Sequence, residues 1–174
     1  MTLETERLLL RMFGPGDLDA YAAICADPEV MRYLGDGKTL DRPNAWRQMA
    51  MILGHWQLRG YGLFALEEKG TGALVGRAGI FEPEGWPGFE LGWMLRRQSW
   101  GKGYATEAAR RVLQHAFTEL GRPHVISLIR EANAPSIRVA ERLGERLEGR
   151  AVIFGQEALV YGIDRAAWRA KDPR

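Results

Sequence analysis

The sequence predicts a mixed α/β fold in which one sheet contains both antiparallel and parallel strands. Strand-like apolar runs and helical repeats follow the order strand, two helices, three strands, helix, strand, helix, two strands. A mixed order of this kind implies both types of strand pairing. One of the helices connects two strands as a crossover, and such a crossover makes its flanking strands parallel neighbours.

The first part of the chain is expected to hold one strand and two helical segments. The strand spans Leu3–Met12, and its centre is apolar. Pro15 and Asp17 then open a helix, because these residue types favour helix starts. Asp27–Leu34 predicts a turn plus a short helical piece, and Gly35–Lys38 predicts a loop.

A longer helix and three strands follow. The helix begins at Pro43 and ends at Gly60–Gly62, and the apolar stripe expected along it is Trp46, Met49, Leu53 and Trp56. The strands are predicted at Leu63–Glu68, Leu74–Phe81 and Phe89–Arg96. The glycine-rich turn Gly70–Gly72 joins the first two of these strands as a hairpin.

The second half begins with the most regular helix, Ala105–Leu120, which Gly121 and Pro123 end. A strand at Val125–Arg130 and a short helix at Ala134–Leu143 come next. Two closing strands, at roughly 147–154 and 158–163, complete the predicted order.

Composition favours one soluble domain over residues 1–174, with 46% hydrophobic and 26% charged residues. No apolar run approaches the ~18–20 residues of a membrane span, and the charged N-terminal segment is unlike a secretory signal peptide. The single cysteine, Cys25, fits a reducing compartment, so a cytoplasmic location is expected. The net charge is +2 and the arginines are scattered, which argues against a nucleic-acid partner and suits an anionic small molecule.

The segment Gln98–Thr106 lies between a predicted strand and a predicted helix. Gly101 and Gly103 allow backbone amides to approach an anion, the helix start adds free N–H groups, and Lys102 and Thr106 can add donors. A plain strand-to-helix turn is an open alternative. A dinucleotide site fits less well because Thr106 stands where its third glycine would be, and a P-loop string is absent from the sequence.

The string Gln98-x-x-Gly101-x-Gly103 resembles the signature of the GNAT acetyltransferase superfamily. Six further segments, in the same order, resemble its branch of ribosomal-protein N-terminal acetyltransferases of the Rim type. They are TERLLLR (5–11), DPEVMRYL (27–34), FELGWML (89–95), WGKGYATEA (100–108), NAPSIRVAERLG (133–144) and LVYGIDRAAW (159–168). The resemblance implies a mostly antiparallel sheet of six to seven strands with a parallel central pair, about four flanking helices, and acetyl-CoA as co-substrate.

The resemblance also implies which residues contact coenzyme A. Pantetheine would pair with the backbone around Met94–Arg96, and an amide near Met94 would donate to the thioester oxygen. The alternative for this strand is a plain core position. The complete implied set is Met94, Leu95, Arg96, Gln98, Gly101, Lys102, Gly103, Tyr104, Ala105, Thr106, Asn133 and Ser136.

Glu90 is the candidate general base. It stands inside an otherwise apolar strand, which is costly for a carboxylate unless the side chain faces a wet cleft. Partial burial would raise its pKa into a useful range. The alternative is a solvent-facing or salt-bridged position.

Asn133 and Ser136 form an N-x-x-S pattern at a helix start, which predicts simple capping. The resemblance adds that this asparagine contacts pantetheine and that Ser136 lies near the CoA sulfur, where it could protonate the leaving thiolate. Two positions depart from the family pattern. Ala140 stands where many members carry a catalytic tyrosine, and Glu145 stands where an aromatic residue is usual.

The remaining candidates concern the acceptor. In relatives the first two helices and their loop wall the acceptor pocket, which makes Tyr33, Trp46 and the 35–38 loop candidate specificity elements. Cys25 is expected to be a packed thiol, and the three histidines lack the spacing of metal ligands.

We therefore expect an enzyme that moves acetyl from acetyl-CoA to a primary amine, either a protein N-terminus or a small molecule, in a ternary complex. No metal, nucleic acid or membrane partner is expected, and a homodimer is common in this branch. The alternative is a CoA-binding sensor or interaction domain without catalysis.

Overall fold

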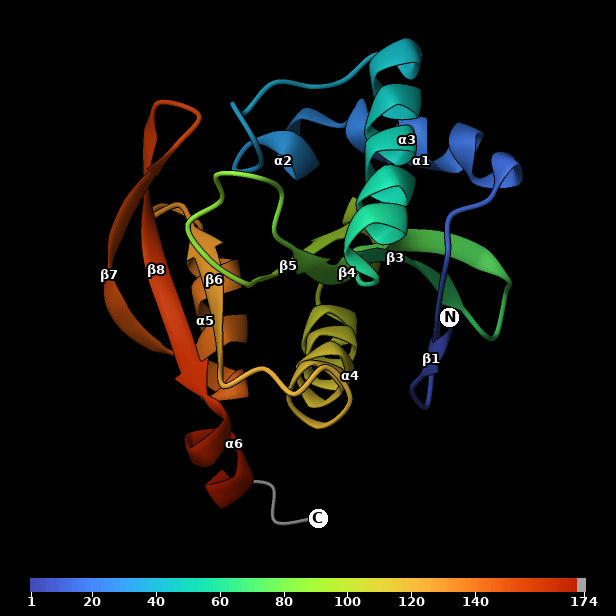
Figure 1. Ribbon diagram of the computed structural model, residues 1–174. Coiled ribbons are helices and arrows are strands. Elements are labelled where there is room, and N and C mark those ends of the chain that lie inside the picture. Colours follow the sequence, from blue (N-terminus) through green and yellow to red (C-terminus); the bar gives the residue numbers. More distant parts are fainter. Residues whose placement is uncertain (172–174) are drawn as a thin grey trace.

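The computed structural model describes residues 1–171 and shows one eight-stranded sheet with helices on both faces (Figure 1). The strand order across the sheet is β1-β2-β3-β4-β5-β6-β8-β7. The strands are β1 (Leu3–Glu4), β2 (Leu8–Arg11), β3 (Leu63–Glu68), β4 (Ala73–Phe81), β5 (Glu90–Leu95), β6 (His124–Ile129), β7 (Arg146–Ile153) and β8 (Gln156–Asp164). Every neighbouring pair is antiparallel except β5 and β6, so the predicted mixed sheet with a parallel central pair is confirmed.

Six α-helices flank this sheet in the described part of the chain. They are α1 (Leu18–Cys25), α2 (Pro28–Met31), α3 (Arg42–Arg59), α4 (Tyr104–Thr118), α5 (Ala134–Leu143) and α6 (Arg165–Lys171). The helices α1 and α3 pack together on one face, whereas α4 and α5 pack together on the other (Figure 1). No described helix is both long and apolar enough to cross a membrane.

The predicted first strand, Leu3–Met12, is a hairpin in the structure. The chain reverses at Thr5–Arg7, so that β1 pairs with β2 and Leu3 faces Leu10. The turn forms because the Leu8 amide donates to Thr5 Oγ1 at 2.9 Å and the Thr5 amide donates to the Leu8 carbonyl at 3.0 Å. This reversal gives eight strands instead of six to seven, and the short α2 and the unpredicted α6 bring the α-helices to six instead of about four.

The predicted stripe on α3 is half right. Met49 and Trp56 are buried, whereas Trp46 is 57% exposed and Leu53 37% exposed. The buried face instead contains Ala45 and Ile52 with Met49 and Trp56. Both sets follow helical spacing, so the periodicity alone does not select between the two overlapping stripes.

The parallel strands β5 and β6 separate soon after they meet. Their only paired residues are Glu90 and Ile126, where the Ile126 amide donates to the Phe89 carbonyl at 3.1 Å. Both strands continue, β5 to Leu95 and β6 to Ile129, while each keeps a full ladder with its antiparallel neighbour. A gap therefore opens in the middle of the sheet towards the carboxyl ends of the two parallel strands.

Candidate active site

Two cavities meet at the gap between β5 and β6. The larger cavity, about 1090 Å³, lies beside α4 and α5, and residues along it include Leu95, Gly101, Gly103, Thr106, Arg110 and Arg138. The smaller cavity, about 220 Å³, lies beside α3, and residues along it include Gln48, Arg77, Phe81, Trp86, Glu90 and Gly92. The residues that line both are Tyr33, Leu34, Trp93, Asn133 and Ser136. Two ligands that enter from opposite faces of the sheet could thus meet at these residues.

The segment before α4 forms a tight turn at Gly101 and Gly103, the glycine turn, on the larger cavity. Gly101 and Gly103 have φ angles of 76° and 82°. Residues other than glycine adopt such angles only with strain in the backbone. Gly103 is the N-cap of α4 and offers no side-chain cap, so the first amides of the helix have no acceptor from that residue. Free amides at a helix start bind phosphate groups well.

Only some of the other residues predicted to contact CoA line the larger cavity. The larger cavity is lined by Met94, Leu95, Tyr104, Ala105, Thr106, Asn133 and Ser136, in addition to the two glycines. Arg96, Gln98 and Lys102 lie outside that lining. Arg96 Nε donates to Ser99 Oγ at 3.0 Å, and Gln98 is exposed within the 3₁₀ turn Arg97–Ser99. Arg96 therefore stabilises the turn before the glycines, and the Gln98 side chain faces outwards.

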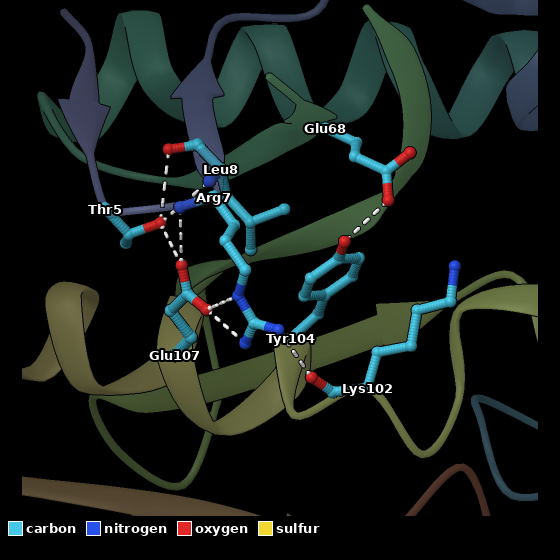
Figure 2. Close-up of polar contacts among 7 residues, drawn as sticks. All are labelled: Thr5, Arg7, Leu8, Glu68, Lys102, Tyr104 and Glu107. Carbon is cyan, nitrogen blue, oxygen red and sulfur yellow. Dashed lines mark hydrogen bonds and ion pairs between the residues drawn. The ribbon is translucent and has the colours of Figure 1, made fainter. Parts of the chain in front are cut away.

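The β1–β2 turn holds the glycine turn in place (Figure 2). Glu107, in the first turn of α4, accepts from Thr5 Oγ1 at 2.6 Å, from the Arg7 amide at 3.0 Å and from Arg7 Nε at 2.7 Å. Arg7 Nη1 also donates to the Lys102 carbonyl at 2.9 Å. Burial by itself would raise the pKa of Glu107, but the hydrogen bonds from Thr5 and Arg7 outweigh it and hold this pKa below its ordinary value. Arg7 thus neutralises the one acid in the first turn of α4.

Tyr104 fixes the start of the same helix from the side of the sheet. Its ring is buried, and its hydroxyl donates to Glu68 Oε1, at the end of β3, at 2.6 Å (Figure 2). The Arg7 guanidinium lies 4.7 Å from the centre of the ring. The first residue of α4 is therefore clamped between β3 and the β1–β2 turn.

Arginines that are scattered in the sequence gather along the larger cavity. Arg110 and Arg111 come from α4, and Arg138 and Arg142 come from α5. Arginine is well suited to phosphate recognition because its planar group donates several hydrogen bonds at once. The cluster is not visible in the sequence, because α4 and α5 bring its members to one cavity only when they pack together.

Glu90 lies in the smaller cavity at the point where the strands separate. Its carboxylate accepts from Trp86 Nε1 at 2.6 Å, and no ion pair holds it among the described residues. Burial raises the pKa of Glu90 to about 7, while the Trp86 N–H, the charge of Arg77 and the Leu128 amide each limit that rise. A carboxyl group with this pKa exchanges protons readily near neutral pH.

The ladder between β4 and β5 determines which amides face the gap. Hydrogen-bonded rungs alternate in an antiparallel pair, and the Arg96 amide donates to the Val75 carbonyl at 2.8 Å. The rung two residues along, Arg77 with Met94, is therefore also hydrogen-bonded. The Met94 amide is thus used within the sheet, and the amides that face away from β4 belong to Trp93 and Leu95. Consistent with this alternation, the Leu95 carbonyl accepts from Trp100 Nε1 at 2.9 Å.

Asn133 and Ser136 cap α5 and also line both cavities. Asn133 Oδ1 accepts from the Ser136 amide at 3.3 Å, which confirms the predicted capping. Trp93 Nε1 donates to Ser136 Oγ at 3.3 Å. The serine hydroxyl thus keeps its own proton to donate at the junction of the two cavities. Ala140 is fully buried and has no group that could replace a tyrosine hydroxyl.

Glu145 takes part in a buried hydrogen-bonded chain that sequence analysis did not anticipate. Its side chain is 3% exposed, its Oε1 lies 3.1 Å from Ser127 Oγ, and Ser127 Oγ donates to the Leu91 carbonyl at 2.9 Å. Ser127 Oγ is thus within hydrogen-bond distance of two acceptors, and its single proton serves one of them at a time unless a protonated Glu145 donates to Ser127. Burial, with the nearby charges of Glu148 and Glu90, raises the pKa of Glu145 to about 8. Ser127, which also contacts Glu145, thus donates to the Leu91 carbonyl, which has no partner on β6 because the two strands separate there.

The mouth of the smaller cavity is formed by three loops. Gly35 contributes the loop after α2, Trp86 the loop after β4, and Phe154 the turn between β7 and β8. Arg130 Nη2 donates to the Gly35 carbonyl at 2.7 Å, which ties the first loop to the end of β6. Tyr33 lines the cavity as predicted, whereas Trp46 lies outside both cavities on the exposed face of α3.

Phe154 has a backbone conformation that is unusual for a bulky residue. Its φ angle is 51°, and its side chain is 64% exposed. The ring nevertheless packs against Trp86 with 5.8 Å between ring centres. A strained position that places an aromatic ring at a cavity mouth suggests a role in ligand binding.

Two further predictions concern residues outside these contacts. Cys25 is fully buried, and burial raises the pKa of its thiol, so the expected packed cysteine is confirmed. Residues 1–171 contain no group of three or more histidine, cysteine, aspartate or glutamate side chains that could hold a metal ion.

Comparisons with known proteins agree with this geometry. Residues 7–146 match the family model described as an acetyltransferase (GNAT) domain. The chain is 32% identical to the uncharacterized N-acetyltransferase p20 of Bacillus licheniformis, over 85% of this chain and 84% of that protein. The crystal structure of an acetyltransferase from Agrobacterium tumefaciens is 36% identical, covers 94% of both chains and superimposes with a TM-score of 0.83.

A more distant solved structure contains coenzyme A. It is the structure of RimL, a ribosomal L7/L12 alpha-N-protein acetyltransferase, in complex with coenzyme A. That protein is 16% identical, covers 94% of this chain and 98% of its own, and has a TM-score of 0.78. At this identity the likeness shows the shared fold alone.

Proposed function

Because this chain belongs to the GNAT acetyltransferase family and is an acetyltransferase, we propose that it transfers acetyl from acetyl-CoA to a primary amine within a ternary complex. GNAT acetyltransferases use acetyl-CoA as their co-substrate, and the finer assignment concerns where the two reactants bind. The acceptor is not fixed by the distant Rim-type structures, because a shared fold does not determine a substrate.

Coenzyme A would occupy the larger cavity. Its pyrophosphate would lie on the amides around Gly101 and Gly103, and its other phosphate would meet arginines of α4 and α5. The pantetheine arm would extend along β5, whose outward-facing amides at Trp93 and Leu95 have no strand partner beyond the Glu90–Ile126 rung. One of these two amides would donate to the thioester oxygen as negative charge develops there.

The amine would enter through the smaller cavity. Its nitrogen attacks the thioester carbon, the new C–N bond forms, and the C–S bond breaks. The proton lost from nitrogen passes to Glu90, either directly or through one water molecule. The thiolate leaves as CoA, and the Ser136 hydroxyl, which lines both cavities, would supply a proton or hydrogen bond to the sulfur. Since a thiol has a pKa near 8.5, a thiolate can also leave without a strong acid.

The observation that supports this proposal most strongly is the position of Glu90. A carboxyl group with a pKa of about 7 lies on the acceptor side of the gap, at the only paired rung of the two parallel strands in the described chain. Glu90 would thus act as a base from the smaller cavity on an amine that attacks acetyl-CoA bound in the larger cavity.

The test is thiol release from acetyl-CoA with a panel of N-terminal peptides, amino acids, polyamines and aminoglycosides. We expect turnover with at least one amine, and a Glu90→Gln variant that binds CoA normally but turns over at least 100-fold more slowly. Tight CoA binding without turnover of any amine would instead favour the non-catalytic CoA-binding domain.

A further inference from the structure

The floor of the smaller cavity has a hollow between a cationic end and a carboxyl end. On the face towards α3, the rung Arg77–Met94 is followed by Gly79–Gly92 and then by Phe81–Glu90. The middle rung carries no side chains, so a space remains over Gly92 between Arg77 and Glu90, and all three residues line the cavity. A β-carbon placed on Gly92 would meet only Glu90 Oε1, at 3.9 Å.

Arg77 is a half-buried cation that forms no ion pair with a described residue, and Glu90, the one acid of the cavity lining, lies at the opposite end of the hollow. Its Nε is buried and has no hydrogen-bond partner among the described residues. Burial raises the pKa values of Tyr21 and Cys25, which lie close enough to Arg77 for its charge to limit that rise, so both side chains are neutral. The apolar Ile52 and Leu63 line the same cavity. An arginine cannot release its proton to escape such a position, so the missing partner is costly unless a ligand supplies it.

Two other side chains of the cavity add hydrogen-bond donors, and one of them adds a second positive charge. Gln48 Oε1 accepts from the Tyr21 hydroxyl at 2.5 Å, which leaves the amide N–H groups of Gln48 as donors. Arg130 also lines the cavity and donates to the carbonyls of Gly35 and Glu157, at 2.7 and 3.1 Å, instead of to a carboxylate. Within the described lining, two guanidinium groups therefore face a single carboxyl group, that of Glu90.

We propose that the acceptor is a small amine that also carries a carboxylate, with the carboxylate bound by Arg77 and Gln48 and the amine directed towards Glu90. This inference rests on the proposed function and deepens it. A volume of about 220 Å³ suits a molecule of amino-acid size, because the pockets that enclose larger ligands exceed about 300 Å³. The carboxylate is unchanged by the reaction, in which nitrogen gains acetyl and loses one proton to Glu90.

The test compares amines that differ only in this carboxylate. Thiol release from acetyl-CoA is measured with the twenty L-amino acids and with their carboxamides. A carboxamide has the less basic α-amine, so a larger fraction of it is neutral, and a preference for the free acid cannot come from amine reactivity. We expect kcat/KM for the preferred amino acid to exceed that for its amide by about tenfold to a hundredfold, the value of a charge-assisted hydrogen bond.

The variants separate recognition from folding. Because the charge of Arg77 also lowers the pKa of Glu90, the readout is the ratio of kcat/KM for the acid to kcat/KM for the amide. Arg77→Met should bring this ratio to about one, whereas Arg77→Lys should keep part of the preference. Arg150→Met, on the exposed strand β7, is the control for loss of an arginine and should keep the full preference. CoA affinity and thermal stability of each variant establish that it is folded.

The outcomes distinguish this inference from the proposed function. Equal turnover of acids and amides by the wild type, or equal loss of both in Arg77→Met, overturns the inference while acetyl transfer stands. If no amine is turned over, calorimetric titration of amino acids into the protein–CoA complex decides the matter. Binding that Arg77→Met abolishes supports the inference, and no binding of any amino acid overturns it.

Discussion

The two cavities that meet at the gap are built in different ways. The larger cavity relies on main-chain groups at the start of α4 and on a glycine turn of a few consecutive residues. The smaller cavity relies on side chains from α3, β4, β5, β6 and three separate loops. The proposed donor site thus depends mainly on backbone conformation, whereas the proposed acceptor site depends on individual side chains, which single substitutions can change.

The largest effect should come from Glu90, the proposed base of the smaller cavity. Glu90→Gln should lower kcat by about 10²- to 10⁴-fold and leave the Kd of CoA unchanged, because the residue lies outside the lining of the larger cavity. Initial rates of thiol release and calorimetric titration of CoA provide the two measurements. A variant that loses CoA affinity and turnover together would show that the two cavities are not functionally separate.

The pH profile sharpens the same assignment. A general base must be deprotonated in order to act, so kcat/KM should rise with pH and level off above the pKa of about 7. Glu90→Gln should lack this limb. A wild-type profile that is flat between pH 5.5 and 8.5, after correction for the neutral amine, would contradict the role of Glu90.

The next largest effect concerns stability and comes from Glu145, which contacts Ser127 of β6 beside the gap. Its pKa is raised in the folded state, so the folded protein keeps a proton that the unfolded chain has lost, and stability should fall as the pH rises from about 4.5 to about 8. Glu145→Gln keeps a donor for Ser127 without the ionisation. It should therefore be more stable than the wild type by a few kcal/mol at pH 9, with almost no difference at pH 4.

Urea unfolding at the two pH values measures this difference. Glu145→Leu serves as the comparison, since it removes both the charge and the donor and leaves Ser127 with the Leu91 carbonyl as its one remaining partner of this chain. If Glu145→Gln and the wild type differ equally at pH 4 and pH 9, ionisation of this residue does not contribute to stability.

A smaller effect is expected from the glycine turn of the larger cavity. Gly101→Ala should raise the Kd of CoA about tenfold, because the left-handed conformation that presents the amides becomes strained by about 1–2 kcal/mol. Gly121→Ala is the matched control. Gly121 also has a positive φ and no atom within 4 Å of an added β-carbon, but it lies at the far end of α4, outside the cavity lining.

Thermal melts and CoA titrations of both glycine variants should show similar losses of stability. Only Gly101→Ala should lose CoA affinity. An equal change in CoA affinity for both variants would indicate that general loss of stability, and not the conformation of the glycine turn, weakens CoA binding.

The smallest effect should come from the mouth of the smaller cavity. Phe154→Asn places a residue that tolerates positive φ at the β7–β8 turn, so stability should rise by about 1 kcal/mol. The KM of the acceptor should rise a few-fold, because the ring that packs on Trp86 is lost. A stability gain with an unchanged KM would limit Phe154 to a structural role.

The sequence was most informative where neighbouring residues act together. The bounds of α5 and the crossover through α4 follow from local periodicity, a proline near the start of α5 and a glycine after its end. Glu90 was predicted because a single acid stands out in an apolar strand. The β1–β2 reversal was missed because Glu107, about 100 residues away in sequence, binds the turn that Thr5 and Arg7 form.

The parts that escaped prediction depend on contacts between distant segments. Glu145 looked like a simple departure from the family pattern, but it is bound to Ser127 within the core. Arg77 lies in a strand that suggested no function, and only the cavity shows that its Nε has no partner in the described chain. Trp46 was expected at the acceptor pocket, but the alternative stripe of α3 faces inwards and leaves it exposed.

The most direct test of the account is a crystal structure of the protein with coenzyme A. We predict that the pyrophosphate lies on the amides at Gly101 and Gly103 and that the CoA sulfur lies beside Trp93 and Ser136, where the larger cavity opens into the smaller one. A sulfur atom held elsewhere in the larger cavity, without access to Glu90, would contradict it.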